Sequence, residues 1–397
     1  MKTAVLKFGG SSVSDDKNLN IVANKIIEYK EKFKNLVVVV SAQGKTTNKL
    51  TEEAQRLSKL PDEREMDMLL SAGEIMSAAK LSILLNKKEC PSVSLTGWQA
   101  GIITNDIHQN AQISEINTRR IKEELSKNKI VVVTGFQGID ENLDVTTLGR
   151  GGSDTSAVSL AAALKADKCY IFSDVDGVYT EDPKRIEKAK KLNTISFEEM
   201  QEIADAGAKV LHNRCIKIGK KFKCDIIAAS TFDNEEGTTI TKEIEDNSIK
   251  GIIKNEDIIK YKIDKKETYK IYEELLKNNI ITEKFKSEEN IEFYIQRKDK
   301  EKLEELLNNL NLKYSSKNII KLSIIGYGVN EDSDTLSVVI DILKNNNIKI
   351  KNISLTQSKI EIITDKLEDE IVKKLHSVLI EKVLCQVVLV EPKTSDK

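Results

Sequence analysis

Lys7 and the two glycines that follow it are the first residues in the chain whose types suit work on a phosphoryl group. The segment Lys7-Phe8-Gly9-Gly10-Ser11-Ser12 ends an apolar run, Ala4–Phe8, that is typical of a buried strand. Paired glycines let backbone N–H groups approach an oxyanion, and a lysine at a strand tip adds a fixed positive charge. The same residues could also form an ordinary Gly-Gly turn beside a solvated lysine, so this motif alone leaves both interpretations open.

Thr147 to Ala157 is the segment richest in candidate chemistry. It reads Thr147-Leu148-Gly149-Arg150-Gly151-Gly152-Ser153-Asp154-Thr155-Ser156-Ala157 and runs into an Ala-rich pattern typical of a buried helix. Ser153 or Asp154 would cap that helix, whose first N–H groups form an anion site. Arg150 offers a planar fork for a carboxylate or a phosphate. A dinucleotide fingerprint is excluded, because G-x-G-x-x-G from Gly149 would need glycine in place of Asp154.

Two further segments could bind a small polar substrate. Ser41-Ala42-Gln43-Gly44-Lys45-Thr46-Thr47 follows an apolar run and offers the hydroxyls of Ser41 and Thr47. It is not a P-loop, because the glycine required five positions before Gly44 is Val39. Glu74, after a short apolar run, would need a cation if it pointed inward. A glutamate on a helix surface is the more common interpretation of that residue alone.

The loop from Ser173 to Pro183 joins an apolar run to several acidic residues. Such acids could hold water around Mg²⁺. Asp176-Gly177 is also typical of a tight turn, and for Asp176 by itself the turn is the favoured interpretation.

These motifs lie where short strands should end. Up to Thr241, β-rich runs alternate with helical patterns, and the runs are continuous in Val and Ile. That pattern is typical of a mostly parallel sheet buried between helices, so we expect a three-layer α/β sandwich. Ligands should then bind beyond the carboxyl ends of the strands. The expected strands are Ala4–Phe8, Leu36–Ser41, Ser92–Thr96, Ile130–Thr134, Cys169–Ser173 and Cys224–Ala228.

A change of composition after Thr241 predicts a second domain. From Lys321 the order strand, helix, strand, strand, helix, strand predicts a ferredoxin-like βαββαβ unit that ends with Gln386–Val390. A weaker copy precedes it. We therefore expect a catalytic domain over 1–245 and a regulatory domain over 246–397, with units at about 256–318 and 319–397. A single irregular C-terminal domain is the alternative, and the last strand could complete either unit.

Composition excludes several other classes of protein. The chain of 397 residues has 62 Lys and Arg against 63 Asp and Glu, so no global field attracts nucleic acid or an anionic membrane. Its apolar runs are strand-sized, and Met1–Ser12 lacks the features of a signal peptide. Five cysteines without metal-ligand spacing suit a reducing compartment. We expect a cytoplasmic protein in which no side chain binds a metal directly.

In this order, the motifs resemble those of the aspartate kinases of the amino-acid kinase family, over residues up to about 240. Thr96–Gly101, Thr134–Gly138 and Gly207–His212 agree with the same family. The C-terminal pair resembles the tandem ACT domains of these enzymes, and no homoserine dehydrogenase segment follows Lys397, so a monofunctional form is expected. The resemblance implies a kinase that uses ATP and Mg²⁺ to phosphorylate the side-chain carboxylate of L-aspartate, the first step of lysine, threonine and methionine (diaminopimelate) biosynthesis.

The resemblance also assigns roles to matching residues. Lys7, Asp154 and Arg150 would be catalytic, with Asp154 organising the lysines at the transfer site. Glu74 would bind the substrate ammonium and Arg150 a carboxylate. The residues expected to hold aspartate are Ser41, Thr47, Glu74, Arg150 and Ser153. The residues expected to hold ATP are Lys7, Gly9, Gly10, Ser11, Ser173, Asp174, Tyr179, Lys184, Lys209 and Val210.

For regulation, the resemblance implies a homodimer or dimer of dimers formed through the ACT units. It also implies inhibition by lysine as the first candidate, and by threonine, alone or with lysine, as the second. The Asp-x-Pro-Gly loop expected early in the first unit is absent, because the chain there reads Asp264-Lys265-Lys266-Glu267. The second unit is therefore the better effector site, and its candidate residues are Asp332, Ser333, Ser354, Thr356 and Gln357. Two alternatives remain: another amino-acid kinase, such as a glutamate 5-kinase or an acetylglutamate kinase, and a catalytically silent amino-acid sensor.

Overall fold

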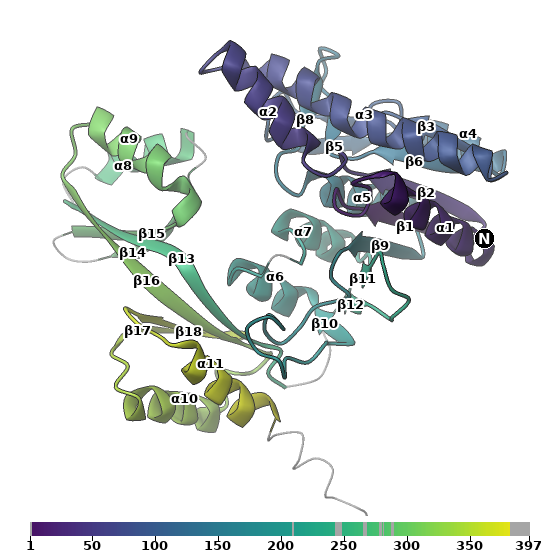
Figure 1. Cartoon of the computed structure of the whole chain (residues 1–397). Helices are drawn as coiled ribbons and strands as arrows, with labels where there is room; N and C mark the ends of the chain where they lie inside the picture. Colours follow the sequence, from purple (N-terminus) through teal and green to yellow (C-terminus); the bar gives the residue numbers. More distant parts are fainter. Residues whose placement is uncertain are drawn as a thin grey trace, which may run out of the picture. The chain divides into compact units, whose positions relative to one another are not determined.

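A computed structural model of the chain describes residues 2–208, 210–242, 248–264, 268–277, 280, 282–286 and 290–381. The chain divides into two compact units. The first consists of Met1–Tyr179 and Lys190–Glu245, and the second of Thr180–Ala189 and Asp246–Lys397. Figure 1 follows the chain through both units, from purple at the N-terminus to yellow. The predicted strand Gln386–Val390 and residue Lys209 lie outside the described residues.

The centre of the first unit is an eight-stranded sheet. Its strands are β1 (Thr3–Phe8), β2 (Asn35–Val40), β3 (Ser92–Leu95), β6 (Ile130–Thr134), β9 (Lys168–Ser173), β10 (Thr194–Ser196), β11 (Ile226–Ser230) and β12 (Thr238–Thr241). They lie in the order β10-β12-β11-β9-β1-β2-β6-β3. Every neighbouring pair is parallel except β11 and β12. The predicted, mostly parallel sheet is therefore confirmed.

Helices cover both faces of this sheet. They are α1 (Asp16–Lys32), α2 (Thr46–Leu57), α3 (Glu63–Lys87), α4 (Arg119–Ser126), α5 (Gly152–Leu164), α6 (Phe197–Asp205) and α7 (Asn213–Phe222). Alternate residues of β1, such as Leu6 and Phe8, share one core with α1 and α3. Because side chains alternate along a strand, Lys7 points to the opposite face. There α5 contacts β1, β2 and β9, and α7 contacts α5.

Among the described helices, α3 alone is long and apolar enough to pass as a membrane span by length and composition. Half of its apolar window is buried inside the first unit. Its buried residues include two carboxylates, Asp67 and Glu74. Seven residues separate these two acids, close to two full turns, so they lie on one face of the helix. That face is turned toward the candidate site.

A second, smaller sheet of the first unit was not predicted. It consists of β4 (Ile102–Thr104), β5 (Ile113–Ile116), β7 (Gln137–Ile139) and β8 (Val145–Thr147), in the order β5-β4-β7-β8. Each strand has only three or four residues, too few for an alternating pattern to appear in the sequence. The sheet matters because β8 leads directly into the Thr147–Asp154 motif.

The second unit is built on one continuous antiparallel sheet in the order β14-β15-β13-β16-β18-β17. The strands are β13 (Gly251–Asp264), β14 (Glu283–Lys286), β15 (Asn290–Gln296), β16 (Tyr314–Ile325), β17 (Ile350–Thr356) and β18 (Lys359–Thr364). The helices are α8 (Thr268–Lys277), α9 (Lys300–Asn309), α10 (Ser333–Asn345) and α11 (Asp369–His376), with short turns η2 (Arg297–Asp299) and η3 (Ser377–Glu381). The longest of these strands, β13, has a register shift between Asn255 and Ile258 in its pairing with β16.

Two cores share this sheet because β13 and β16 each run through both. Ile259 and Tyr261 of β13 belong to the core that contains α8 and α9, whereas Ile252 belongs to the core that contains α10 and α11. Ile186, from the segment Thr180–Ala189, packs in the second of these cores. The chain therefore leaves the first unit after Tyr179 and returns to it at Lys190. The proposed boundary between functional domains, 245/246, stays a prediction.

Candidate active site

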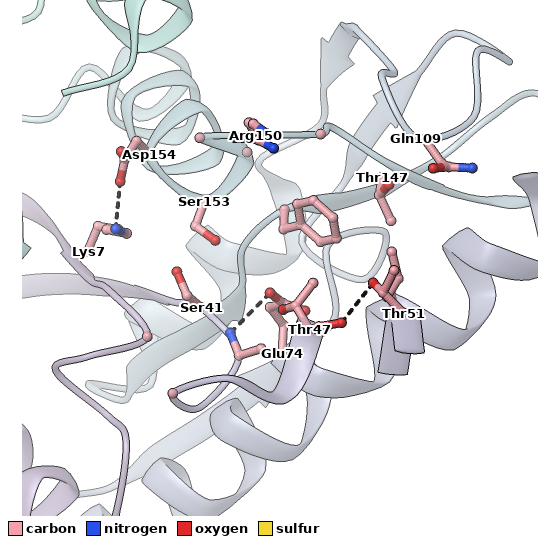
Figure 2. Close-up of a pocket in the computed structure, with 18 residues that line it drawn as sticks. Lys7, Ser41, Thr47, Thr51, Glu74, Gln109, Thr147, Arg150, Ser153 and Asp154 are labelled. Atoms are coloured by element: carbon pink, nitrogen blue, oxygen red, sulfur yellow. Dashed lines mark hydrogen bonds and ion pairs between the residues drawn. The ribbon is translucent and has the colours of Figure 1, made fainter. Parts of the chain in front are cut away.

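A cavity of about 650 Å³ lies beyond the carboxyl ends of β1, β2 and β6. Figure 2 shows Lys7 and Asp154 at one end of it, Gln109 and Thr147 at the other, and Ser41, Ser153 and Glu74 between. The residues that line it are Lys7, Gly10, Ser41, Ala42, Gly44, Thr47, Thr51, Leu70, Glu74, Gln109, Phe136, Thr147, Gly149, Arg150, Gly151, Gly152, Ser153 and Asp154. All the residues that the resemblance assigned to aspartate and to catalysis therefore meet in one place.

Lys7 and Asp154 form a nearly buried ion pair at one end of the cavity. The Lys7 Nζ lies 2.7 Å from the Asp154 Oδ1, and their side chains are 10% and 14% exposed. Lys7 reaches this position because it points to the α5 face of the sheet, and Asp154 lies in the first turn of α5. A lysine held in this way is preorganised: its charge is already in position when a phosphoryl group binds.

Arg150 lies on a loop that only glycine can shape. Gly149 and Gly151 on either side of it have φ of +71° and +68°, in the left-handed region. A Cβ on Gly149 would stand 2.7 Å from the carbonyl oxygen of Gln109. The loop ends at the N-terminus of α5, where free N–H groups attract anions. The exposed guanidinium of Arg150 and these N–H groups give the cavity a positive wall.

Glu74 supplies the opposite charge. Its side chain lies on the buried face of α3, and the residue is only 3% exposed. Its Oε1 accepts a hydrogen bond from the backbone N–H of Ala42 at 3.0 Å. Its Oε2 has no hydrogen-bond partner among the described residues. Burial raises the pKa of Glu74 to about 7, although the bond from Ala42 opposes the shift. A half-satisfied carboxylate that lines a cavity favours a cationic group on the ligand.

Hydroxyl groups line the space between these charges. Ser41 follows β2, Thr47 lies in the first turn of α2, and Ser153 lies in the first turn of α5. Thr51, one turn after Thr47, donates its hydroxyl to the Thr47 carbonyl at 2.9 Å. The hydroxyls of Ser41, Thr47 and Ser153 can donate to carboxylate oxygens without adding charge.

The residues assigned to ATP are less concentrated. Lys7 and Gly10 line the cavity, whereas Gly9, Ser11, Ser173, Asp174, Tyr179 and Val210 do not. Gly9 and Ser173 are nonetheless neighbours across the sheet, since the Gly9 N–H donates to the Phe172 carbonyl at 3.3 Å. Lys184 belongs to the second unit, and Lys209 lies outside the described residues.

Among the cavity residues that sequence reasoning missed are Gln109 and Thr51, and Phe136 was named only as part of the segment Thr134–Gly138, without a role. Phe136 follows β6, so the rule that ligands bind beyond the carboxyl ends of strands could have found it. Gln109 carries no comparable signal, because it lies in a loop between β4 and β5, which were themselves not predicted. Gln109 and Phe136 share a left-handed backbone, with φ of 58° and 71°.

The effector candidates lie in the second unit, at the start of α10 and around the β17–β18 turn. Asp332 caps α10, where its Oδ1 accepts from the N–H groups of Asp334 and Thr335 and its Oδ2 from the Thr335 hydroxyl. The Thr335 hydroxyl bond is the main cause that lowers the pKa of Asp332. Gln357 donates its side-chain amide to the Tyr327 hydroxyl at 2.9 Å. Asp332 therefore has a structural task in α10.

Comparison with known proteins identifies the family. Residues 2–230 match the model of the amino acid kinase family. The aspartokinase of Geobacillus stearothermophilus is 39% identical over 394 residues, which cover 95% of this chain and 97% of that protein. The chain belongs to the aspartokinase family. It is therefore a kinase of amino-acid biosynthesis, and the resemblance to the aspartate kinases is confirmed.

Solved aspartokinase structures agree with this fold. Aspartokinase III of E. coli in complex with aspartate and ADP has a TM-score of 0.79 at 22% identity, and covers 95% of this chain and 100% of its own. The same enzyme in complex with lysine and aspartate has a TM-score of 0.77 at 23% identity, over 95% of this chain and 99% of its own. Both extend over the second unit, so the fold is shared in both units.

Proposed function

We propose that the cavity of this aspartokinase transfers the γ-phosphoryl group of ATP to the side-chain carboxylate of L-aspartate, which gives 4-phospho-L-aspartate and ADP. The observation that carries the proposal is the open Oε2 of buried Glu74, in the cavity that also holds Arg150. An amino acid with one ammonium and two carboxylates satisfies both groups. Its ammonium binds Glu74, one carboxylate binds the fork of Arg150, and the hydroxyls of Ser41, Thr47 and Ser153 complete the pocket.

The transfer needs no general base, because a carboxylate nucleophile is already ionised at neutral pH. A side-chain oxygen of aspartate attacks the γ-phosphorus, and the bond to the bridging oxygen breaks as ADP leaves with the electron pair. Catalysis then consists of placing the two reactants and offsetting negative charge. Lys7, which Asp154 holds in place, supplies positive charge between the substrate and the nucleotide, and the N-terminus of α5 adds to it.

We place ATP beyond β9 and beside Lys7. The proposed contacts are Gly9, Gly10, Ser11, Ser173, Asp174, Tyr179, Lys184, Lys209 and Val210. Support comes from the neighbouring positions of Gly9 and Ser173 and from the ADP in the E. coli aspartokinase III complex. Mg²⁺ should accompany ATP, since it binds mainly to phosphates and water. The exposed Asp174 carboxylate suits water held around such an ion.

An assay with ATP, Mg²⁺ and a panel of acidic amino acids tests this proposal. ADP release is coupled to NADH oxidation, and hydroxylamine traps the acyl phosphate product. We expect turnover with L-aspartate and at most a few per cent of that rate with L-glutamate or N-acetyl-L-glutamate. A preference for either of these would assign the chain to another amino-acid kinase activity, and binding of ATP and aspartate without turnover would indicate a silent sensor.

We also propose that lysine, alone or with threonine, inhibits the enzyme through the second unit, and that this unit joins two chains into a homodimer or a dimer of dimers. The lysine complex of E. coli aspartokinase III supports the choice of effector. The proposed contacts are Asp332, Ser333, Ser354, Thr356 and Gln357. An inhibitor acts only if it prefers a state with an impaired active site.

Titration of the full chain with lysine and threonine, together with light scattering for its mass, tests this regulation. Activity that neither amino acid changes would contradict the allosteric proposal, and a monomer at assay concentration would contradict the dimer. Cytoplasmic localisation stays a prediction.

A further inference from the structure

Asp67 is a buried carboxylate of α3 that does not line the cavity, yet it binds two segments that do. Its residue is 0% exposed. Its two oxygens accept from the Thr147 N–H at 3.0 Å, the Thr147 hydroxyl at 2.5 Å and the Gln109 N–H at 3.1 and 3.2 Å. His108 Nδ1 lies 2.9 Å from the Oδ2 and donates, because a carboxylate only accepts. One anion therefore joins the loop after β4 to the end of β8.

Arg214 joins the same two segments from a different element. It lies in the first turn of α7, and its Nη1 donates to the carbonyl oxygens of Leu148, at 2.5 Å, and Ala111, at 3.2 Å. Its Nη2 donates to the Asn110 Oδ1 at 2.6 Å. Burial lowers the pKa of Arg214, which stays a cation at neutral pH. A cation thus binds the carbonyl groups of the segments whose N–H groups bind Asp67.

The two segments, residues 108–111 and 147–150, are here named the rim. Their backbones are also joined directly, because the Ala111 N–H donates to the Thr147 carbonyl at 2.9 Å. Gln109 has a left-handed φ of 58°, a conformation that costs a non-glycine residue free energy and persists only where the surroundings hold it. Both Gln109 and Arg150 of the rim line the cavity, Gln109 at the end away from Lys7 and Arg150 between Asp154 and Thr147 (Figure 2).

We propose that Asp67 and Arg214 are positioning residues for the amino-acid substrate, which hold the rim so that Arg150 and Gln109 meet the substrate carboxylate. The inference rests on the proposed function, since it assigns this end of the cavity to the amino acid. Neither residue touches the substrate in this account. Both act on KM for aspartate through the rim, and neither acts on ATP, which binds at the Lys7 end.

Asp67→Asn is the direct test. The amide keeps the shape but must turn an NH₂ group toward donors that the carboxylate accepted. We expect KM for aspartate to rise at least about tenfold, because the displaced rim no longer contacts the bound substrate. KM for ATP should stay within twofold of wild type. The matched control is Glu199→Gln, which neutralises a buried carboxylate in the capping box of α6, outside the cavity. It should lower thermal stability without changing either KM.

A rescue distinguishes positioning from a general loss of structure. Gln109→Gly removes the free-energy cost of a left-handed φ, so the rim keeps its conformation with fewer stabilising contacts. Gln109→Gly should itself raise KM for aspartate, because a side chain that meets the substrate is lost. In that background we expect Asp67→Asn to cause a further increase in KM that is several times smaller than the increase it causes in wild type. Equal increases in the two backgrounds would overturn the proposal.

Arg214→Lys is the independent variant, and it decides the question if Asp67→Asn does not fold. A lysine keeps the charge but cannot bridge three acceptors with one planar group. We expect the same rise in KM for aspartate alone. A folded variant whose KM for aspartate stays within twofold of wild type, or whose KM for ATP rises in parallel, would overturn the inference. Failure of wild type to phosphorylate aspartate in this assay would instead contradict the proposed function.

Discussion

Buried charges are used differently in the two units of this aspartokinase. In the second unit, Lys254 is 8% exposed and lies 2.7 Å from Glu256 and 2.9 Å from Asp369. Lys321 and Glu361 of neighbouring strands are 6% and 7% exposed and 3.2 Å apart. In the first unit, Glu74 is buried as deeply but keeps one oxygen open to a cavity. Satisfied pairs hold a sheet together, whereas a half-satisfied charge lowers stability until a ligand arrives.

The pKa directions of two carboxyl groups follow this difference. The hydrogen bond from Lys254 is the main cause that lowers the pKa of Asp369. Burial without a cation raises the pKa of Glu74 to about 7. A partner on the protein thus keeps a carboxylate charged, whereas the open carboxylate depends on the substrate for the same effect.

The largest effect should come from Lys7→Ala. It removes the fixed charge at the phosphoryl end of the cavity, and we expect kcat to fall about a hundredfold or more in a folded protein. The control is Lys220→Ala, which removes an exposed lysine of α7 paired with Glu198. Steady-state kinetics with circular dichroism measure both. A folded Lys7→Ala variant with near-normal kcat would show that this ion pair is structural, like those of the second unit.

Glu74→Gln should have the next largest effect, a rise of tens-fold in KM for aspartate at pH 8, because the amide does not attract an ammonium. The wild-type carboxyl has a pKa of about 7, so it charges as pH rises from 6 to 8 and kcat/KM for aspartate should rise with it. The variant should show a flat profile over the same range. A wild-type profile with no step near 7 would contradict this role.

Although Glu74→Gln should weaken aspartate binding, it should raise the stability of the substrate-free enzyme at pH 8. The folded pKa of about 7 lies above the ordinary value of 4.5, so the folded state binds the extra proton. The contribution of Glu74 to the stability of the substrate-free enzyme is then fully present below about pH 4.5 and is lost as pH rises through about 7. Glu74→Gln removes that loss. Its Tm at pH 8 without substrate should exceed that of wild type, and a lower Tm would contradict the account of an open charge.

Arg150→Lys should have a smaller effect on catalysis. A point charge replaces a planar fork, so we expect KM for aspartate to rise about tenfold while KM for ATP changes little. Arg64→Lys is the control, because the Arg64 fork binds Asp144 of the protein itself, at 2.9 and 2.5 Å. A fall in ATP affinity instead would move Arg150 to the phosphate site.

Lys321→Met should leave kcat and both KM values within twofold of wild type. It breaks a buried pair of the second unit, although Lys359 still lies 3.2 Å from Glu361. We expect a loss of about 1–3 kcal/mol in the free energy of unfolding, measured with denaturant, because Glu361 loses one of its two cationic partners. A large change in kcat would show that this buried pair of the second unit affects catalysis as well as stability.

The sheet and its ligand edge could be predicted because they depend on local patterns. Runs such as Ile130–Thr134 are continuous in Val and Ile, and glycine-rich segments follow them. The small sheet of β4, β5, β7 and β8 could not be predicted, since strands of three or four residues leave no periodicity. The full length of β13 could not be predicted either, because the polar residues Lys254, Asn255, Glu256 and Asp257 interrupt its apolar pattern.

The sequence by itself determined the family, the α/β core and the residues of the main motifs, because each of these depends on which residues follow one another along the chain. Only the tertiary structure decided which carboxylate oxygens of Glu74 and Asp67 have hydrogen-bond partners. Both are acids of one helix, seven residues apart, and local pattern treats them alike. The fold gives all the oxygens of Asp67 partners from β8 and the loop after β4, and leaves one oxygen of Glu74 open to the cavity. Partners so distant along the chain are fixed by packing, which no spacing within a helix can encode.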